Sequence, residues 1–140
     1  MKIGVIKETK EFEKRVALSP DVVKLLKKKE FDVVIESGAG EGSYFSDQDY
    51  LDAGAEVSGV SEVFAADVVL KVNLPTLEEI AQMKPESACI SYMYAYQHPE
   101  VIAALNAKRI SSFSMDAVPR ISRAQKMDAL SSQANLAGYK

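Results

Sequence analysis

The polar residues near the C-terminus have the types and spacing of an anion-binding or partner-binding site. Residues 120–140 contain four basic residues against the single acid Asp128: Arg120, Arg123, Lys126 and Lys140. The whole chain has a net charge of −3, so residues 1–119 are acidic and contrast with this basic end. Such a contrast is typical of an anion site or a partner contact, because guanidinium groups bind anions through directed hydrogen bonds. Solvated surface charge is the simpler alternative.

The same segment predicts a long helix. Ser122 and Gln125 match the Ser-x-x-Gln capping box, which predicts a helix start at Ser122. Apolar residues then recur at helical spacing on one face: Met127, Leu130, Ala134 and Ala137. Hydrogen-bonding side chains fall on another face: Gln125, Asp128, Ser132 and Asn135, with Ser131 at its edge. We therefore expect Arg120 and Arg123 at the positive end of a helix, in a chain that is part of something larger.

A glycine-rich segment invites comparison with a phosphate-binding loop. Residues 38–43 read Gly-Ala-Gly-Glu-Gly-Ser after an apolar strand pattern. A dinucleotide fingerprint needs G-x-G-x-x-G opening directly into a helix. The spacing here is G-x-G-x-G, Glu41 would repel a pyrophosphate, and the next helix cap is Ser46. The segment is therefore interpreted as a tight connection that uses positive φ angles.

Other reactive residue types stand alone in the sequence. His98 has no evident nucleophile or carboxylate partner, and Cys89 lies in an apolar run that predicts a core position. Three tyrosines at period two are expected to share one strand face and to pack at the core or its rim rather than on a ligand ring: Tyr92, Tyr94 and Tyr96. Arg15 could bind a carboxylate, but alone it favours a surface arginine. One histidine and one cysteine give no metal site, and no basic stripe with interleaved aromatic residues indicates nucleic acid.

The elements that position these residues alternate between strand and helix patterns. Strands are predicted at 3–6, 31–35, 67–72, 87–92 and 110–115. Helices are predicted after Ser19, after Ser46, over 58–66, after Thr76 and from His98. This alternation predicts an α/β fold: a parallel, Rossmann-like (flavodoxin-like) sheet with helices on both faces, lacking a GxGxxG nucleotide motif.

Composition narrows the class of protein further. The 140 residues are 47% hydrophobic and 26% charged, as in ordinary globular domains, which excludes a disordered or collagen-like chain. No apolar run reaches the roughly 18 residues of a membrane span, and a single cysteine excludes a disulfide framework. The N-terminus reads as a strand rather than a signal peptide, so we expect a reducing, cytoplasmic setting.

Several segments together resemble the family of alanine dehydrogenase and the NAD(P) transhydrogenase alpha subunit. Near the N-terminus they are residues 7–9 (Lys-Glu-Thr), 15–20 (Arg-Val-Ala-Leu-Ser-Pro), 38–43 and 53–55. Further on they are residues 115–125 (Met-Asp-Ala-Val-Pro-Arg-Ile-Ser-Arg-Ala-Gln), 127–132 and 135–139. The second group resembles the transhydrogenase branch in particular. The resemblance covers essentially the whole chain.

Two positions separate the branches by chemistry. Alanine dehydrogenase interconverts an amine and a ketone and must move protons, and the resemblance places a lysine and a histidine for this at positions 73 and 94. This sequence has Asn73 and Tyr94 there, and its histidine is displaced to position 98. Transhydrogenation moves hydride directly between two nicotinamides and needs neither an acid nor a base. Arg15 matches the substrate-carboxylate arginine of the dehydrogenase branch.

The resemblance implies that the segment from Arg120 to Asp128 lies over the nicotinamide and ribose of NAD(H). Its implied cofactor-binding residues are Arg120, Ile121, Ser122, Arg123, Gln125, Asp128 and Ser131. Gln125 and Asp128 are the implied catalytic residues. Gln125 would reach the second nucleotide, whereas Asp128 and Ser131 would orient the carboxamide and hold Arg120.

The resemblance also implies the context of the chain. Residues 1–121 would be an N-terminal α/β domain, and residues 122–140 a long helix leading toward a separate NAD-binding Rossmann domain, with a returning C-terminal segment completing the first domain. The chain would then be the first part of the NAD(H)-binding subunit of a proton-translocating transhydrogenase. NADP(H) would be bound by a partner domain. The enzyme would use no metal, and the chain alone would be inactive. We expect a homodimeric full protein, cytoplasmic and peripheral to the inner membrane through the membrane part of its complex. Two alternatives remain open: a fragment of an alanine-dehydrogenase-type oxidoreductase, and a non-enzymatic partner-binding module.

Overall fold

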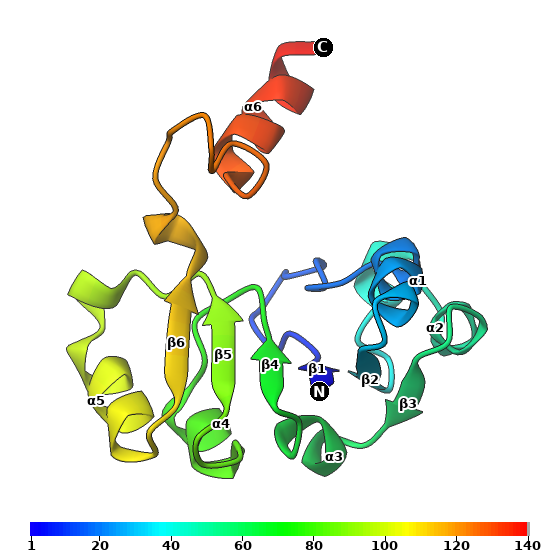
Figure 1. Cartoon of the computed structure of the whole chain (residues 1–140), viewed down its shortest axis with the longest axis horizontal. Helices are drawn as coiled ribbons and strands as arrows, with labels where there is room; N and C mark the ends of the chain where they lie inside the picture. The colour runs from blue at the N-terminus through cyan, green and yellow to red at the C-terminus, as the bar shows by residue number, and fades with distance from the viewer. Residues whose placement is uncertain (140) are drawn as a thin grey trace.

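The five predicted strands and one further short strand come together in one six-stranded, all-parallel sheet (Figure 1). The computed structural model describes residues 1–139. Its strands are β1 (Lys2–Val5), β2 (Asp32–Glu36), β3 (Glu56–Ser58), β4 (Val68–Leu70), β5 (Ala88–Ser91) and β6 (Ser111–Ser114). They lie in the order β3-β2-β1-β4-β5-β6. The Rossmann-like parallel sheet is therefore confirmed, with the Rossmann strand order rather than the flavodoxin-like order 2-1-3-4-5.

Residues 1–139 form six helices, and those that follow Ser19, Ser46, Thr76 and His98 begin where the sequence predicts. The six are α1 (Pro20–Lys28), α2 (Asp47–Asp52), α3 (Val60–Phe64), α4 (Leu77–Gln82), α5 (Pro99–Ala107) and α6 (Ala129–Tyr139). Short 3₁₀ turns cover Glu41–Ser43, Ala95–Gln97 and Met115–Ala117. The side chains of Ser19, Ser46 and Thr76 each accept a hydrogen bond from a backbone N–H of the first turn. These caps satisfy amide groups that have no partner inside the helix.

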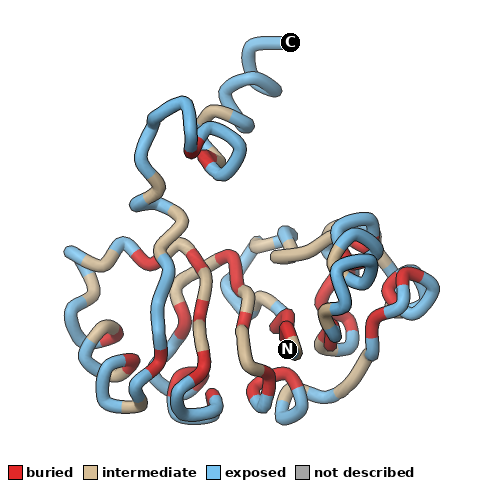
Figure 2. Tube along the Cα trace, viewed as in Figure 1, coloured by how far each residue is buried: buried red, intermediate tan, exposed pale blue. Residues whose placement is uncertain are grey.

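Two apolar cores lie on opposite faces of the sheet. The larger joins α3, α4 and α5 to the sheet around Val69, Cys89 and Phe64. The smaller joins α1 and α2 to β1 and β2 around Val33 and Ile35. Figure 2 shows the buried strand segments between these layers. Helices on both faces are thereby confirmed, and Cys89 is the core residue that the sequence predicts.

One part of the sheet has apolar side chains outside both cores. Leu70, Ile90 and Phe113 are neighbours in the strand register of β4, β5 and β6. Ile90 and Phe113 belong to neither core, and Phe113 is 59% exposed. Because Cys89 faces the larger core, alternation along β5 turns Ile90 to the opposite face. Within residues 1–139 this face is covered over β1 to β3 but not over β5 and β6.

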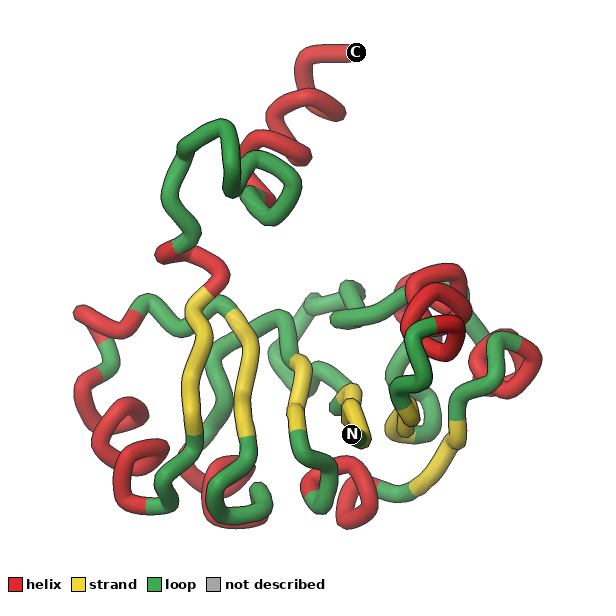
Figure 3. The backbone as a smooth tube through the Cα atoms, in the orientation of Figure 1, coloured by secondary structure: helices red, strands yellow, loops and turns green. Residues whose placement is uncertain are grey.

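The last helix differs from its prediction. It begins at Ala129 rather than at Ser122, and residues 121–127 form successive turns (Figure 3). The reason is a competing cap: Asp128 accepts the N–H of Leu130 at 3.0 Å and the hydroxyl of Ser131. Gln125 and Met127 therefore lie before the helix, and the predicted long amphipathic face does not form. Lys140, the last basic residue of the predicted cluster, lies outside the described residues.

Two smaller predictions are also corrected. Residues 58–66 are not one helix, because β3 ends at Ser58 and α3 covers only Val60–Phe64. The three tyrosines do not alternate on a strand, because β5 ends at Ser91 and a turn follows. That turn leaves Tyr96 fully exposed.

Candidate functional site

A cleft of about 820 Å³ lies at the carboxyl ends of the central strands. The loops after β1, β4, β5 and β6 line it, together with the start of α6. α6 projects beyond these strand ends (Figure 1). The cleft includes the ends of β1 and β4, where the strand order of the sheet reverses. Such a switch point is where open α/β sheets bind their ligands.

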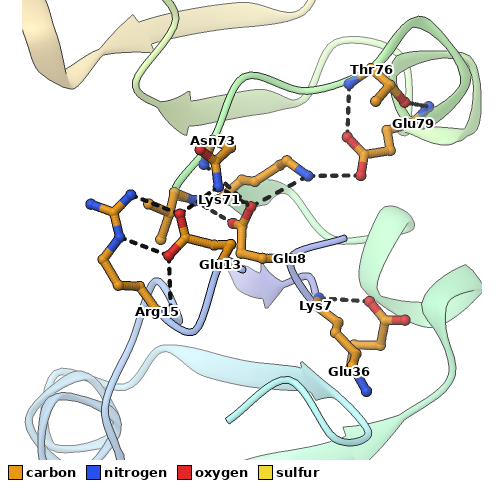
Figure 4. Close-up of polar contacts among 10 residues, drawn as sticks. Lys7, Glu8, Glu13, Arg15, Glu36, Lys71, Asn73, Thr76 and Glu79 are labelled. Carbon is orange, nitrogen blue, oxygen red and sulfur yellow. Dashed lines mark hydrogen bonds and ion pairs between the residues drawn. The ribbon is translucent and has the colours of Figure 1, made fainter. Parts of the chain in front are cut away.

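A buried ion network forms the floor beneath the cleft (Figure 4). Lys71 Nζ lies 2.8 Å from Glu79 Oε1 and 3.6 Å from Glu8 Oε2. The side chains of Lys71 and Glu8 are only 3% and 2% exposed. Glu79 also accepts the Thr76 N–H at 2.8 Å, so it caps α4 while it pairs with Lys71. Desolvated charges of this kind persist only when they are paired and hydrogen-bonded.

Asn73 links this network to the cleft wall. Its Nδ2 donates to Glu8 Oε2 at 3.0 Å and to Glu13 Oε2 at 2.9 Å. Glu8 in turn accepts the backbone N–H groups of Val72 and Asn73, which fixes the end of β4. A neutral amide thus bridges two carboxylates at the cleft wall.

Arg15 is held by Glu13 on the same wall. Its Nε and one terminal nitrogen each donate to Glu13 at 2.8 Å, a bidentate pair. The hydrogen bond from Arg15 is the main cause that lowers the pKa of Glu13 to about 2. The pair therefore stabilises the fold at neutral pH, and this stabilisation is lost as the pH falls from about 4.5 toward 2. Glu13 thus matches the charge of Arg15 and takes up two of its N–H donors, while the Arg15 side chain remains 65% exposed at the cleft.

The opposite wall comes from the ends of β5 and β6. Tyr92 and Tyr94 stack with ring centroids 6.5 Å apart, and both line the cleft. Asp116 Oδ1 accepts the N–H groups of Met93 and Tyr94 at 2.9 and 3.2 Å. His98 also lines the cleft, and its Nδ1 lies 3.4 Å from Glu100 Oε1, a partner that sequence reasoning missed.

Two of the predicted cofactor-binding residues line the cleft, namely Arg120 and Asp128. The hydrogen bond from Ser131 is the main cause that lowers the pKa of Asp128, and the positive charge of Arg120 also contributes. Asp128 is buried although it is charged, because it caps α6 through Leu130 and Ser131. Within residues 1–139 the other predicted residues are not among those that line the cleft: Ile121, Ser122, Arg123, Gln125 and Ser131.

The glycine-rich segment has its own structural role. Gly38 has φ +75° and donates its N–H to Asp47 at 2.8 Å. A side chain on Gly42 would meet the backbone of Lys14 at 2.9 Å. The N–H groups of residues 39, 41, 43, 44 and 45 all donate to backbone carbonyls of this segment or of β2. These amides are engaged inside the protein, in line with a tight connection rather than a phosphate cradle.

Comparison with known proteins shows the family of this chain. The model of the "Alanine dehydrogenase/PNT, N-terminal domain" family matches residues 4–137. The chain belongs to this family.

Individual members differ in how similar they are to this alanine dehydrogenase/PNT domain. It is 49% identical over 140 residues to the NAD(P) transhydrogenase subunit alpha of Haemophilus influenzae, covering 100% of this chain and 27% of that protein. It is 37% identical over 119 residues to an alanine dehydrogenase of Staphylococcus epidermidis, covering 84% of this chain and 32% of that protein. The crystal structure of transhydrogenase from Sinorhizobium meliloti superposes with a TM-score of 0.94 at 45% identity, covering 99% of this chain and 42% of that one. The chain spans about a quarter to two fifths of the length of these proteins.

Sequence reasoning missed the buried ion network of this alanine dehydrogenase/PNT domain. Glu8, Lys71 and Glu79 were not among the predicted site residues, although all three lie at or under the cleft. The sequence does contain an indication of this network, because Lys71 interrupts an otherwise apolar strand pattern. A lysine there needs a buried carboxylate partner.

Residues 1–139 of the domain hold neither a membrane-spanning helix nor a cluster of metal ligands. None of its helices is both long and apolar enough to cross a membrane. The same residues hold no group of three or more histidine, cysteine, aspartate or glutamate side chains arranged to bind a metal ion.

Proposed function

We propose that this domain is the N-terminal part of the NAD(H)-binding subunit of an NAD(P) transhydrogenase, where it positions nicotinamide for direct hydride transfer between NADH and NADP⁺. One observation carries the proposal. Asn73 stands where the resemblance places a lysine in the dehydrogenase branch, and its amide donates to both Glu8 and Glu13. Arg15 is paired with Glu13. The wall is therefore built for fixed geometry rather than for proton transfer with an amino acid.

The residues of the cleft fit one end of NAD(H). NAD(H) supplies the hydride when it is bound, through its nicotinamide ring. The cleft offers a planar aromatic wall at Tyr92 and Tyr94, a cation at Arg120 and an anion at Asp128. The glycine-rich segment fits the pyrophosphate poorly, since most of its amides are engaged internally. We infer that this domain holds the nicotinamide end while another domain holds the rest of NAD(H).

The catalytic task of these residues is orientation. Hydride transfer between two nicotinamides needs the rings at reacting distance and no proton donor or acceptor. In this proposal Arg120 and Asp128 hold the first ring, and exposed Gln125 reaches toward the ribose of the second nucleotide. Ser131 acts through Asp128, to which its hydroxyl is hydrogen-bonded.

The wider assembly is part of the same proposal. The subunit would contact an NADP(H)-binding part and a proton-translocating membrane part, and its full-length form would be a homodimer on the cytoplasmic side of the inner membrane. The proposal is supported by the similarity to a protein named as one subunit of a transhydrogenase. We also propose that residues 1–121 form one domain and that the segment 122–140 leads to a second domain. The exposed, projecting α6 supports this division (Figure 2).

An isotope experiment tests the reaction. The complete transhydrogenase that carries this domain is given NADH deuterated at nicotinamide C4, with NADP⁺ as acceptor, in ordinary water. Direct transfer predicts that the deuterium appears in NADPH without dilution by solvent hydrogen. Loss of the label to solvent would contradict the proposal, as would turnover of alanine with NAD⁺ by the same protein.

The isolated 140-residue chain is expected to bind NADH with a Kd well above the micromolar range. Most amides of the glycine-rich segment donate inside the protein, and the adenosine contacts are proposed to lie on another domain. Isothermal titration calorimetry with NADH measures this. A micromolar Kd would contradict the proposal that most NADH contacts lie on another domain. It would instead favour the glycine-rich segment as a phosphate-binding loop.

A further inference from the structure

The turn after β5 holds a bulky residue in an unfavourable backbone conformation. Tyr94 has φ 46° and ψ 51°, the left-handed region that residues with a Cβ rarely adopt. Outliers of this kind persist only when the surrounding structure enforces them, and they gather at functional sites.

Asp116 enforces the turn from the 3₁₀ turn that follows the neighbouring strand β6. Its Oδ1 accepts the N–H of Met93 at 2.9 Å, the N–H of Tyr94 at 3.2 Å and the hydroxyl of Ser114. Burial alone would raise the pKa of Asp116, but the hydrogen bonds from Ser114, Tyr94 and Met93 hold it below its usual range. Asp116 is therefore charged at neutral pH and binds two consecutive amides of the strained turn.

The strained turn aims the Tyr94 ring at the cleft. The ring lies against Tyr92 with a centroid distance of 6.5 Å and an interplanar angle of 24°, and Tyr94 remains 50% exposed. Tyr94, Arg120 and Asp128 all line the same cleft. Tyr96, two residues further on, is fully exposed and does not line it, so the conformation at Tyr94 separates the two rings.

We propose that the Tyr94 ring is a stacking platform for the nicotinamide ring and that it binds the oxidised ring more tightly than the reduced one. This inference rests on the proposed function, which it deepens by naming a positioning residue and a preference between two redox states. Asp116 is the residue that holds the platform in place.

The preference follows from the charge of the ligand ring. A tyrosine ring carries a negative π-face, which attracts a cation placed over it. The nicotinamide ring of NAD⁺ is a cationic pyridinium, whereas the ring of NADH is an uncharged dihydropyridine. Both rings gain from contact with an aromatic surface, but only the oxidised ring gains the cation–π attraction. Arg15 and Arg120 oppose a cationic ring, but they act equally in wild type and in Tyr94 variants, so the comparison isolates the tyrosine ring.

The experiment compares the affinities of the two redox forms. Isothermal titration calorimetry with NAD⁺ and with NADH is performed on the complete transhydrogenase subunit and on its Tyr94→Leu variant. We expect the Kd for NAD⁺ to rise about two- to fivefold more than the Kd for NADH, the size of a partly exposed cation–π contact. A general loss of structure would raise both Kd values by the same factor.

Two further variants complete the test. Tyr94→Phe keeps the π-face and should restore the wild-type ratio of the two Kd values. Tyr96→Leu removes a neighbouring exposed ring from the same turn and should leave both Kd values unchanged. Equal effects of Tyr94→Leu on both nucleotides, or none, would overturn the platform while the isotope test still stands for the function. A wild-type subunit that binds neither nucleotide would overturn the proposed function itself.

Discussion

Replacing Lys71 by methionine is expected to lower the free energy of unfolding by about 3–5 kcal/mol. Methionine fills nearly the same volume, so the change removes the charge with little loss of packing. The carboxylates of Glu8 and Glu79 would remain buried without the cation that both contact. Urea denaturation followed by circular dichroism measures the effect.

Lys84 provides a matched control for this variant. It pairs with Asp67 at 2.6 Å, but the two side chains are 50% and 41% exposed. Lys84→Met should therefore cost less than about 1 kcal/mol, because water replaces the lost partner. A similar loss for both variants would show that burial does not set the strength of the Lys71 network.

A second change should partly rescue the Lys71 variant. Glu79→Gln removes one of the two unpaired charges, while a glutamine at this position still completes the capping box with Thr76. The loss of stability in the double variant is expected to be smaller than the sum of the two single losses by roughly 0.5–3 kcal/mol, the usual coupling between residues in contact. Additive losses would contradict the electrostatic explanation.

Local signals predicted the elements that have strong caps or long apolar runs. Ser19, Ser46 and Thr76 mark the starts of α1, α2 and α4, since each needs only residues within one helical turn. β3 was missed because it has three residues, Glu56–Ser58, and pairs only with β2 at the sheet edge. Nothing within such a short segment records that a neighbouring strand is available.

The start of α6 shows where capping patterns become ambiguous. Ser122 with Gln125 and Asp128 with Ser131 both place a polar residue three positions after a capping residue. The structure selects Asp128, whose carboxylate receives both the Leu130 N–H and the Ser131 hydroxyl. A charged acceptor forms the stronger hydrogen bonds, but the sequence pattern does not rank the two sites.

The buried network was hidden by sequence distance rather than by chemistry. Glu8 follows β1 and Lys71 follows β4, two strands that are far apart in sequence but adjacent in the sheet. Only the strand order brings their side chains together. The segment from Arg120 to Asp128 was predicted from the resemblance alone. In the structure Arg120 and Asp128 line the cleft, whereas Gln125 is exposed outside it.

Replacing Asp128 by alanine in the complete transhydrogenase is expected to slow single-turnover hydride transfer at least about tenfold, which corresponds to roughly 1.4 kcal/mol of activation barrier. The change frees the Leu130 N–H and the Ser131 hydroxyl and removes an anion from the cleft wall. NADH affinity should change only a few-fold, because most of the binding energy is proposed to come from contacts on another domain. Gln125→Asn, which withdraws its amide by one methylene, should slow the transfer in the same way.

The matched control is Asp49→Ala in α2. Asp49 completes a capping box with Ser46, as Asp128 caps α6, but it lies outside the cleft. This control should cost about 1 kcal/mol of stability and leave the rate of hydride transfer unchanged. The rate of the Asp128 variant should also stay flat with pH across the neutral range, because the step that it slows involves no proton. An unchanged rate in both Asp128→Ala and Gln125→Asn would mean that the segment before α6 is ordinary solvated surface, and that ring positioning lies with other residues of the cleft.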